Sequence, residues 1–267
     1  MLDGIALGQY IPADSAIHRL DPRCKLLLTV IVMAGVFMAD GILIFLIWGA
    51  LLFLITKKAK IPISSVLRSI KPVLVLIIFT SVIHIFFTQG RAILNLGPIA
   101  VTYEGIIMAA RMSMRLIYLV MYASILTLTT SPSELSDGIE SIMKPFQKIG
   151  LPAHETAMMM TIALRFIPTL FEETDRIMKS QLSRGADFSS GGLIKRAKSY
   201  IPVLIPMFVI VFQRADTLAS AMESRCYRGG RGRVRMRPLK WGRNENTYLA
   251  AIITIMIASS MAERMIK

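Results

Sequence analysis

The two longest apolar runs near the start of the chain predict membrane-spanning helices. Residues 26–38 and 42–55 carry no charged side chain, and only Ala39, Asp40 and Gly41 separate them. One helix through both runs would be about 45 Å long, whereas the hydrocarbon core of a bilayer is about 30 Å thick. We therefore expect a hairpin of two short helices that turns at Asp40 and Gly41.

The first helix of this hairpin has a clear start signal in the sequence "LDPR". We expect Asp21 to be its N-cap and Pro22 to lie in its first turn. Basic residues flank both outer ends of the hairpin, which indicates that both ends face the cytoplasm.

Three further apolar runs complete a set of five predicted spans: residues 73–87, 104–130 and 247–262. Arg111 and Arg115 lie one helical turn apart in the second of these, so we expect them to face protein or water and not lipid. The positions of the basic residues predict a cytoplasmic amino terminus and an external carboxyl terminus. Residues 88–102, rich in turn-forming residues, are interpreted as an external loop.

Between residues 131 and 245 charged side chains are mixed with many Met, Ile, Leu and Phe residues, a pattern typical of amphipathic helices. We predict three of them, within residues 131–150, 154–184 and 191–225. The first begins with a capping pattern, in which Ser131 or Ser133 precedes Glu134.

One apolar stretch in this region raises the alternative of a sixth span. Residues 201–212 are uncharged but number only twelve and contain Pro202 and Pro206, whereas a span needs about twenty residues. We favour a helix that lies at the inner membrane interface.

These patterns predict an all-α membrane protein with about five transmembrane helices and an interfacial bundle of three amphipathic helices. Residues 1–130 are expected to form an N-terminal membrane domain of four transmembrane helices, the first two of them the short hairpin. Residues 131–245 form the amphipathic region, and residues 246–267 form the last transmembrane helix.

Composition supports a membrane protein, because 54% of the 267 residues are hydrophobic and only 18% are charged. The net charge of +14 agrees with the excess of basic residues on the cytoplasmic side of membrane proteins. Both cysteines, Cys24 and Cys226, fall in segments assigned to that side, so we expect reduced thiols.

A basic cluster in residues 225–243 has two interpretations. It consists of Arg225, Arg228, Arg231, Arg233, Arg235, Arg237, Lys240 and Arg243, with Tyr227 and Trp241 nearby. It could bind anionic lipid or nucleic acid, or it could hold the inner end of the last span in place. We favour the second interpretation and expect no nucleic acid partner.

The sequence offers no catalytic or metal-binding motif. It has no phosphate-binding Gly-x-x-x-x-Gly-Lys loop and no Gly-x-Ser-x-Gly nucleophile elbow. The stretch "HETAM" lacks the second histidine that a zinc protease motif requires. We therefore expect a non-catalytic chain without a metal or cofactor of its own.

Two similar tips close two of the predicted amphipathic helices. "KSQLSRGAD" contains Ser183-Arg184-Gly185, and "AMESRCYRG" contains Ser224-Arg225-Cys226. An arginine between small residues can enter a narrow groove on a partner protein and form a bidentate pair with a carboxylate. The repetition of this pattern favours two matching contacts with two partners.

Three longer stretches carry a resemblance to a known family: "GQYIPADSAIHRLDPRCKL", "ALRFIPTLFEETDRIMKSQLSRGADF" and "RADTLASAMESRCY". Together they resemble the transmembrane T component of energy-coupling factor (ECF) vitamin transporters, of the group whose scaffold serves several substrate-binding subunits. The resemblance implies a scaffold in the cell membrane between two ABC-type ATPases, identical or different, and an exchangeable membrane S component that binds the substrate. It also implies that ATP and Mg²⁺ are bound by the ATPases and that this chain transmits their motion.

In that family two x-Arg-x tips, commonly Ala-Arg-Gly, end two cytoplasmic coupling helices. This chain has Ser in place of Ala in both tips and Cys in place of Gly in the second. Tyr227-Arg228-Gly229 is a competing candidate for the second tip. The resemblance implies that Arg184 and Arg225, with Ser183, Gly185, Ser224 and Cys226 beside them, each contact a different ATPase.

We further expect an adaptable apolar surface toward the S component, because Met side chains repack easily. Its candidate residues are Met158, Met159, Met160, Ile162, Phe166, Met207 and Phe208. Packing of these side chains within the chain itself is an equally good interpretation of the same pattern.

Overall fold

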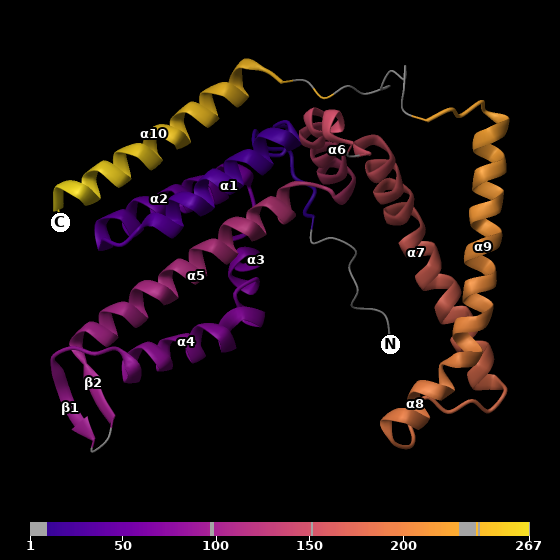
Figure 1. Ribbon diagram of the computed structural model, residues 1–267, viewed down its shortest axis with the longest axis horizontal. Coiled ribbons are helices and arrows are strands. Elements are labelled where there is room, and N and C mark those ends of the chain that lie inside the picture. The colour runs from indigo at the N-terminus through magenta and orange to yellow at the C-terminus, as the bar shows by residue number, and fades with distance from the viewer. Residues whose placement is uncertain (1–9, 97–98, 151, 230–238, 240, 267) are drawn as a thin grey trace. The chain divides into compact units, whose positions relative to one another are not determined.

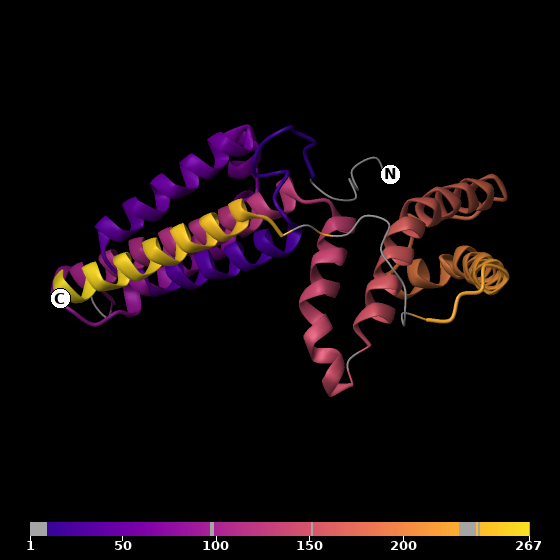
Figure 2. The same cartoon turned by 90° about the horizontal axis from the view of Figure 1, so that it is seen from above.

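A computed structural model shows an almost wholly helical chain of two compact units (Figures 1 and 2). It describes residues 10–96, 99–150, 152–229, 239 and 241–266. The bundle unit comprises Gly8–Gly138 and Pro238–Lys267, and the helix-pair unit lies within Ile139–Arg237. The boundary falls inside α6 (Pro132–Met143).

The bundle unit contains α1 (Pro22–Met38), α2 (Ile42–Ala59), α3 (Ile63–Arg68), η1 (Lys71–Val73), α4 (Leu74–Phe87), α5 (Tyr103–Thr129) and α10 (Arg243–Ile266). The predicted hairpin of two short helices is confirmed. Asp21 is the N-cap of α1, and its side chain accepts a hydrogen bond from the backbone N–H of Arg23. Between α4 and α5, β1 (Ala92–Leu96) pairs antiparallel with β2 (Ile99–Thr102). The sequence predicted a loop here but not these two strands, and the external position of this loop stays a prediction.

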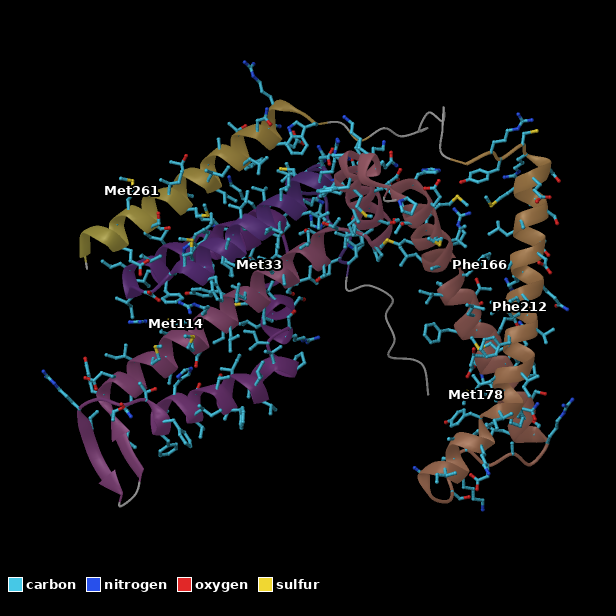
Figure 3. The ribbon with its side chains drawn as sticks, viewed as in Figure 1. Met33, Met114, Phe166, Met178, Phe212 and Met261 are labelled. Atoms are coloured by element: carbon cyan, nitrogen blue, oxygen red, sulfur yellow. The ribbon has the colours of Figure 1, made fainter. Side chains whose placement is uncertain are left out.

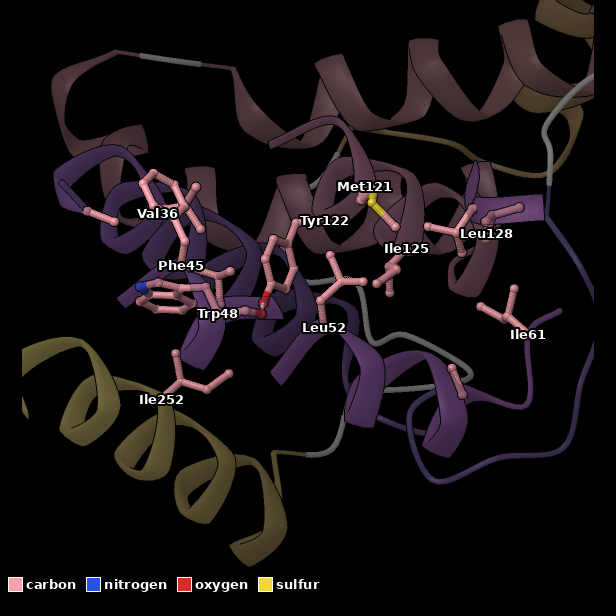
Figure 4. Packing of buried hydrophobic residues seen from close by; sticks show 14 of the residues in the cluster. Val36, Phe45, Trp48, Leu52, Ile61, Met121, Tyr122, Ile125, Leu128 and Ile252 are labelled. Atoms are coloured by element: carbon pink, nitrogen blue, oxygen red, sulfur yellow. Dashed lines mark hydrogen bonds between the residues drawn. The ribbon is translucent and has the colours of Figure 1, made fainter. Parts of the chain in front are cut away.

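The core of the bundle unit is built around Trp48 on α2 (Figure 4). The Trp48 side chain has 0% exposure, and Gly35 on α1 leaves room for its ring. The Tyr122 hydroxyl on α5 donates a hydrogen bond of 2.6 Å to the Trp48 carbonyl oxygen, while Ile252 packs from α10. One aromatic side chain thus joins α1, α2, α5 and α10.

Arg115 on α5 faces protein, as predicted. Its guanidinium donates to the Asp40 carboxylate at 3.1 Å and to the Ala39 carbonyl at 2.8 Å. It also lies over the Phe37 ring, 5.3 Å from the centroid. Arg111, one turn earlier, lines a hollow together with Asp40 and Glu263. The turn between α1 and α2 is therefore attached to α5.

α6 begins with the predicted capping box. The Ser131 N–H donates to Glu134 Oε2 at 3.2 Å, and the Glu134 N–H donates to Ser131 Oγ at 3.3 Å. The α-helix ends at Met143 and continues as the 3₁₀-helix η2 (Lys144–Ile149). The capping residue is therefore Ser131 and not Ser133.

The helix-pair unit consists mainly of α7 (Ala153–Ser183), α8 (Leu193–Ser199) and α9 (Ile201–Ser224). α7 and α9 run antiparallel (Figure 1). Arg214 on α9 forms an ion pair of 3.1 Å with Glu173 on α7, and Thr174 contacts the Met207 sulfur at 3.3 Å. The predicted single helix 191–225 is in fact two, because the chain leaves the helix at Tyr200, immediately before Ile201-Pro202.

Four helical segments among the described residues are long and apolar enough to cross a membrane: Ile42–Ala59, Ile63–Phe87, Tyr103–Thr129 and Ile201–Ser224. The first three coincide with predicted spans. α1, with 17 residues, and α10 are not among them. The argument that residues 201–212 are too short to span was wrong, because they belong to a helix of 24 residues. The interfacial position of this helix stays a prediction.

We expect Gly35→Ala to destabilise the bundle unit, because the new methyl group would overlap with the buried Trp48 ring. Overpacking of this kind costs about 1–3 kcal/mol, which a lower melting temperature of the detergent-purified chain would report. Gly49→Ala is the matched control, since its methyl group would meet only the outer end of the half-buried Tyr118 side chain, with the hydroxyl 2.6 Å away, and this end can move. Equal melting temperatures for the two variants would contradict this account.

Candidate functional site

The first tip, Ser183-Arg184-Gly185, is a Schellman motif at the end of α7. Arg184 is the C-cap of the helix. The Gly185 N–H donates to the Leu182 carbonyl at 2.9 Å, and the Ala186 N–H donates to the Gln181 carbonyl at 3.0 Å. This pattern satisfies the last carbonyl groups of the helix and turns the chain sharply away after the arginine.

The second tip, Ser224-Arg225-Cys226, repeats the same motif at the end of α9. Arg225 is the C-cap, the Cys226 N–H donates to the Glu223 carbonyl at 2.8 Å, and the Tyr227 N–H donates to the Met222 carbonyl at 3.0 Å. The equivalent of Arg184 in geometry is therefore Arg225. The competing candidate, Arg228, lies three residues further on, beyond the helix.

The residue after each arginine has a left-handed backbone conformation. Its φ is +88° at Gly185 and +56° at Cys226. Glycine adopts this conformation without steric cost, whereas a residue with a side chain pays about 1–2 kcal/mol. Cys226 in the second tip therefore keeps the motif but strains it.

Both tip arginines are exposed, and among the described residues no carboxylate lies within 4.0 Å of either guanidinium. The positive charges also lie next to the negative ends of two helix dipoles, which stabilises a cation there. Each tip thus has a fixed backbone and presents an exposed guanidinium to an acidic group on another molecule.

Asp187 organises the loop after the first tip. Its carboxylate accepts hydrogen bonds from the side chain and backbone N–H of Ser190 and from those of Ser189. These hydrogen bonds lower the pKa of Asp187, and the bond from the Ser190 side chain has the largest effect. The carboxylate therefore stays ionised at neutral pH. The loop then leads to α8, and the Phe188 and Tyr200 rings contact each other at a centroid distance of 5.1 Å.

The second tip adjoins a hollow of about 560 Å³ between α7 and the end of α9. Its apolar lining includes Met158, Ile162 and Phe166 from α7 and Leu218 and Met222 from α9. Three arginines also line it: Arg165, Arg225 and Arg228. An apolar hollow with three cations suits a partner segment that carries both acidic and apolar side chains.

The two tips lie at opposite ends of the α7–α9 pair (Figure 1). The first tip is at the α8 end, where Phe188 contacts Tyr200, and the second is beside the first half of α7, where Met158 and Ile162 lie. The 24 residues of α9 span about 36 Å of helix axis. The helix pair therefore holds two equivalent arginine tips at a set, long distance from each other.

The structure divides the residues that we assigned to an S-component surface. Met158, Ile162 and Phe166 line the hollow beside the second tip, and Met207 contacts Thr174 between the two helices. Met159 and Phe208 are exposed, at 61% and 60%, and Met160 is half-buried. The predicted set therefore contains both internal packing residues and free surface.

An apolar stripe on α9 is the clearest exposed surface of the pair. Its side chains are between 47% and 67% exposed and follow helical spacing: Ile201, Leu204, Ile205, Phe208, Val209 and Phe212. Phe212 is labelled on α9 and Phe166 on α7 in Figure 3. In the sequence, residues 201–212 form one apolar block. In the structure, Val203 is buried, whereas the six residues of the stripe are exposed.

Most of the basic cluster in residues 225–243 lies outside the described residues, namely 230–238 and 240. Its proposed contacts with anionic lipid or nucleic acid stay untested. Among the described residues, no group of three or more His, Cys, Asp or Glu side chains could hold a metal ion.

We expect substitutions at the residue after each arginine to change the stability of the tips in opposite directions. Cys226→Gly should stabilise the last turn of α9 by up to about 1 kcal/mol, because it relieves the left-handed backbone. Gly185→Ala should destabilise the last turn of α7 by a similar amount, through the backbone alone, since nothing lies within 4 Å of the new methyl group. Amide hydrogen exchange of these two turns measures both effects.

Cys226→Ala is the matched control, because it removes the thiol but keeps the backbone strain. It should leave the exchange rates near those of the original chain. If Cys226→Ala slowed exchange as much as Cys226→Gly, the thiol and not the backbone would be the cause.

Comparisons with known proteins identify the family of the chain. A family model described as "Cobalt transport protein" (CbiQ) matches residues 13–236. The chain is 56% identical over 237 residues to the energy-coupling factor transporter transmembrane protein EcfT of Thermanaerovibrio acidaminovorans, covering 89% of this chain and 88% of the relative. It is 56% identical over 249 residues to the EcfT of Acidaminococcus fermentans, covering 91% of each chain, and 48% identical over 264 residues to that of Thermosediminibacter oceani, covering 98% of each. The chain therefore belongs to the CbiQ family and, within it, to the transmembrane proteins of energy-coupling factor transporters.

Proposed function

We propose that this transmembrane component of an ECF transporter transmits the motion of two ABC-type ATPases to an exchangeable S component, for the uptake of a vitamin or micronutrient. One observation carries the proposal: two exposed arginines cap two antiparallel helices with the same Schellman geometry, at opposite ends of one helix pair. Equivalent tips fit a partner that offers equivalent sockets, such as a pair of related ATPase subunits.

Each tip arginine would pair with a carboxylate in a groove of one ATPase. A bidentate guanidinium–carboxylate pair is directional as well as strong, so it can transmit a movement as well as hold a contact. The apolar hollow beside Arg225 would take further side chains of the same partner. ATP and Mg²⁺ would act in the ATPases, and this chain would take no part in the hydrolysis.

Charge along α7 supports a position of the helix pair at the cytoplasmic face of the cell membrane. α7 carries Glu155, Arg165, Glu172, Glu173, Asp175, Arg176 and Lys179, and it is not among the described helices that could span a bilayer. α9 packs along α7 and forms an ion pair with it through Arg214. Charges inside the hydrocarbon core cost several kcal/mol each, so a pair of this composition fits the interface better than the core.

The exposed stripe of α9 would then contact the S component. When ATP binding draws the two ATPases together, the tips follow, and the stripe moves relative to the S component. The coupling arises because the partners bind one arrangement of the helix pair more tightly than the other.

We expect Arg184→Glu and Arg225→Glu each to weaken assembly with the ATPases. Each variant removes one partner of a buried charge pair and places a glutamate opposite the carboxylate of the ATPase. The resulting repulsion should reduce co-purification of the ATPases and ATP-dependent uptake at least about tenfold. Co-purification from membranes and uptake of labelled vitamin by the reconstituted complex are the measurements. Wild-type uptake by the double variant would refute the proposal.

Arg228→Glu is the matched control for the second tip, because this exposed arginine lines the same hollow but caps no helix. It should have a clearly smaller effect than Arg225→Glu. The reverse order would move the second contact to Arg228.

We expect Phe208→Asp to release the S component and leave the ATPases bound. Phe208 is 60% exposed in the middle of the stripe, so a charge there disrupts an apolar contact without entering the core of the unit. The ratio of S component to ATPase in the purified complex should fall about tenfold. Ser220→Asp, an exposed position outside the stripe on the same helix, is the control, and an equal loss in both variants would argue against the stripe.

A further inference from the structure

The bundle unit contains an apolar groove of about 350 Å³ that the coupling role does not use. α1, α2, α5 and α10 form its walls, with side chains that include Val32, Leu51, Leu54, Ile125, Ile252 and Ile255. The groove opens to the surface of the unit, where Leu54 is 54% exposed. The groove is therefore open on a surface that we assign to the membrane.

Polar groups gather at one end of this groove. Lys25 lies in the first turns of α1, Lys58 in the last turn of α2, Thr129 at the end of α5 and Tyr248 near the start of α10. These helix ends belong to the side that the sequence assigns to the cytoplasm. The polar end therefore lies at the level of the lipid headgroups, and the apolar part extends toward the middle of the bilayer.

Lys25 is the unusual member of this group. Only 5% of the residue is exposed, and its Nζ donates to the His18 carbonyl at 2.9 Å and to the Thr129 carbonyl at 3.0 Å. Among the described residues no carboxylate lies within 4.0 Å of this nitrogen. A buried ammonium is normally paired with an anion. Lys25 also lines the groove, and its Nζ has three N–H donors against the two carbonyl acceptors named above.

The dimensions of the groove match one kind of molecule. From Lys25 to Val32 along α1, and from Lys58 to Leu51 along α2, the wall runs seven residues, about 10 Å of helix. Lys25 and Lys58 line one end of the groove, and mostly apolar side chains line the rest. A ligand must therefore join an anionic group to an extended hydrocarbon.

We propose that this groove binds an anionic phospholipid of the inner leaflet. One acyl chain lies between α10 and α2, and the headgroup phosphate accepts hydrogen bonds from Lys25 and Lys58. A zwitterionic lipid brings its own ammonium group, so it compensates the two lysines less well. The bound chain fills the gap between the last helix and the hairpin, so the lipid stabilises the position of α10.

The test is lipid binding to the purified full-length chain, by native mass spectrometry in non-ionic detergent. Dioleoyl phosphatidylglycerol and dioleoyl phosphatidylcholine have identical tails, so their difference isolates the headgroup. We expect the first to bind about tenfold more tightly, the size of a hydrogen bond between charged groups. Equal affinities would overturn the proposal.

Two groove variants and one control variant locate the site. Lys58→Ala should remove most of the preference for phosphatidylglycerol, whereas Lys57→Ala, a neighbouring exposed lysine that does not line the groove, should keep it. Ala251→Trp, an exposed groove position on α10, should block the binding of both lipids. Melting temperatures without added lipid verify that both variants fold.

The opposite results are equally informative. Unchanged binding in Ala251→Trp would place the lipid elsewhere on the chain. Equal effects of Lys57→Ala and Lys58→Ala would mean that the preference for phosphatidylglycerol arises from the general charge of the surface. If Ala251→Trp did not fold, the comparison of the two lysine variants would decide the matter alone.

Discussion

The antiparallel packing of α7 on α9 is the constraint on which the rest of the proposed mechanism depends. Two contacts near the middle of the pair, Glu173 with Arg214 and Thr174 with Met207, hold the helices side by side. Because the helices run in opposite directions, their carboxyl ends point to opposite ends of the pair. Parallel packing would have brought both arginines to one place, where a single partner could bind them.

The same packing decides what each residue of the pair does. It buries Val203, and it turns Ile205, Phe208 and Phe212 outward. It also leaves a hollow at the second tip, lined by Arg225 and by residues of α7 that lie about sixty positions earlier in the chain. Apolar side chains of the pair thus have three different roles: some form internal contacts, some form the exposed stripe and some line the hollow.

The two units rely on different physical interactions. Trp48, Gly35 and Tyr122 hold the bundle unit together by close packing and one buried hydrogen bond, and Arg115 ties the α1–α2 turn to α5. The helix-pair unit has few buried side chains and many exposed ones, both apolar and charged. Close packing suits a fixed membrane scaffold, whereas open apolar and charged surfaces suit contacts with partners.

Local signals in the sequence predicted the elements whose causes are local. The Asp21 N-cap, the turn at Asp40 and Gly41 and the Ser131–Glu134 capping box depend on residues a few positions apart, and all three are present. The break at Tyr200 and the strands β1 and β2 were missed, because apolar periodicity alone does not record where a helix stops or where two short strands pair. The uncharged stretch 201–212 was a poor guide to the length available for a span, because the residues after Phe212 continue the same helix to Ser224.

The sequence by itself therefore determined the membrane class, most helices and the two small-Arg-small tips, since each depends on composition or on neighbouring residues. The sequence also favoured Arg225 over Arg228 as the second tip, because the helical pattern continues to Arg225. Only the tertiary structure decided that the two tips lie at opposite ends of one helix pair. It alone brought Lys25, Lys58 and Tyr248 to the same end of a groove. The reason is physical: contacts between helices that are distant in the sequence form only when the chain has folded, and no pattern of neighbouring residues encodes the distance between them.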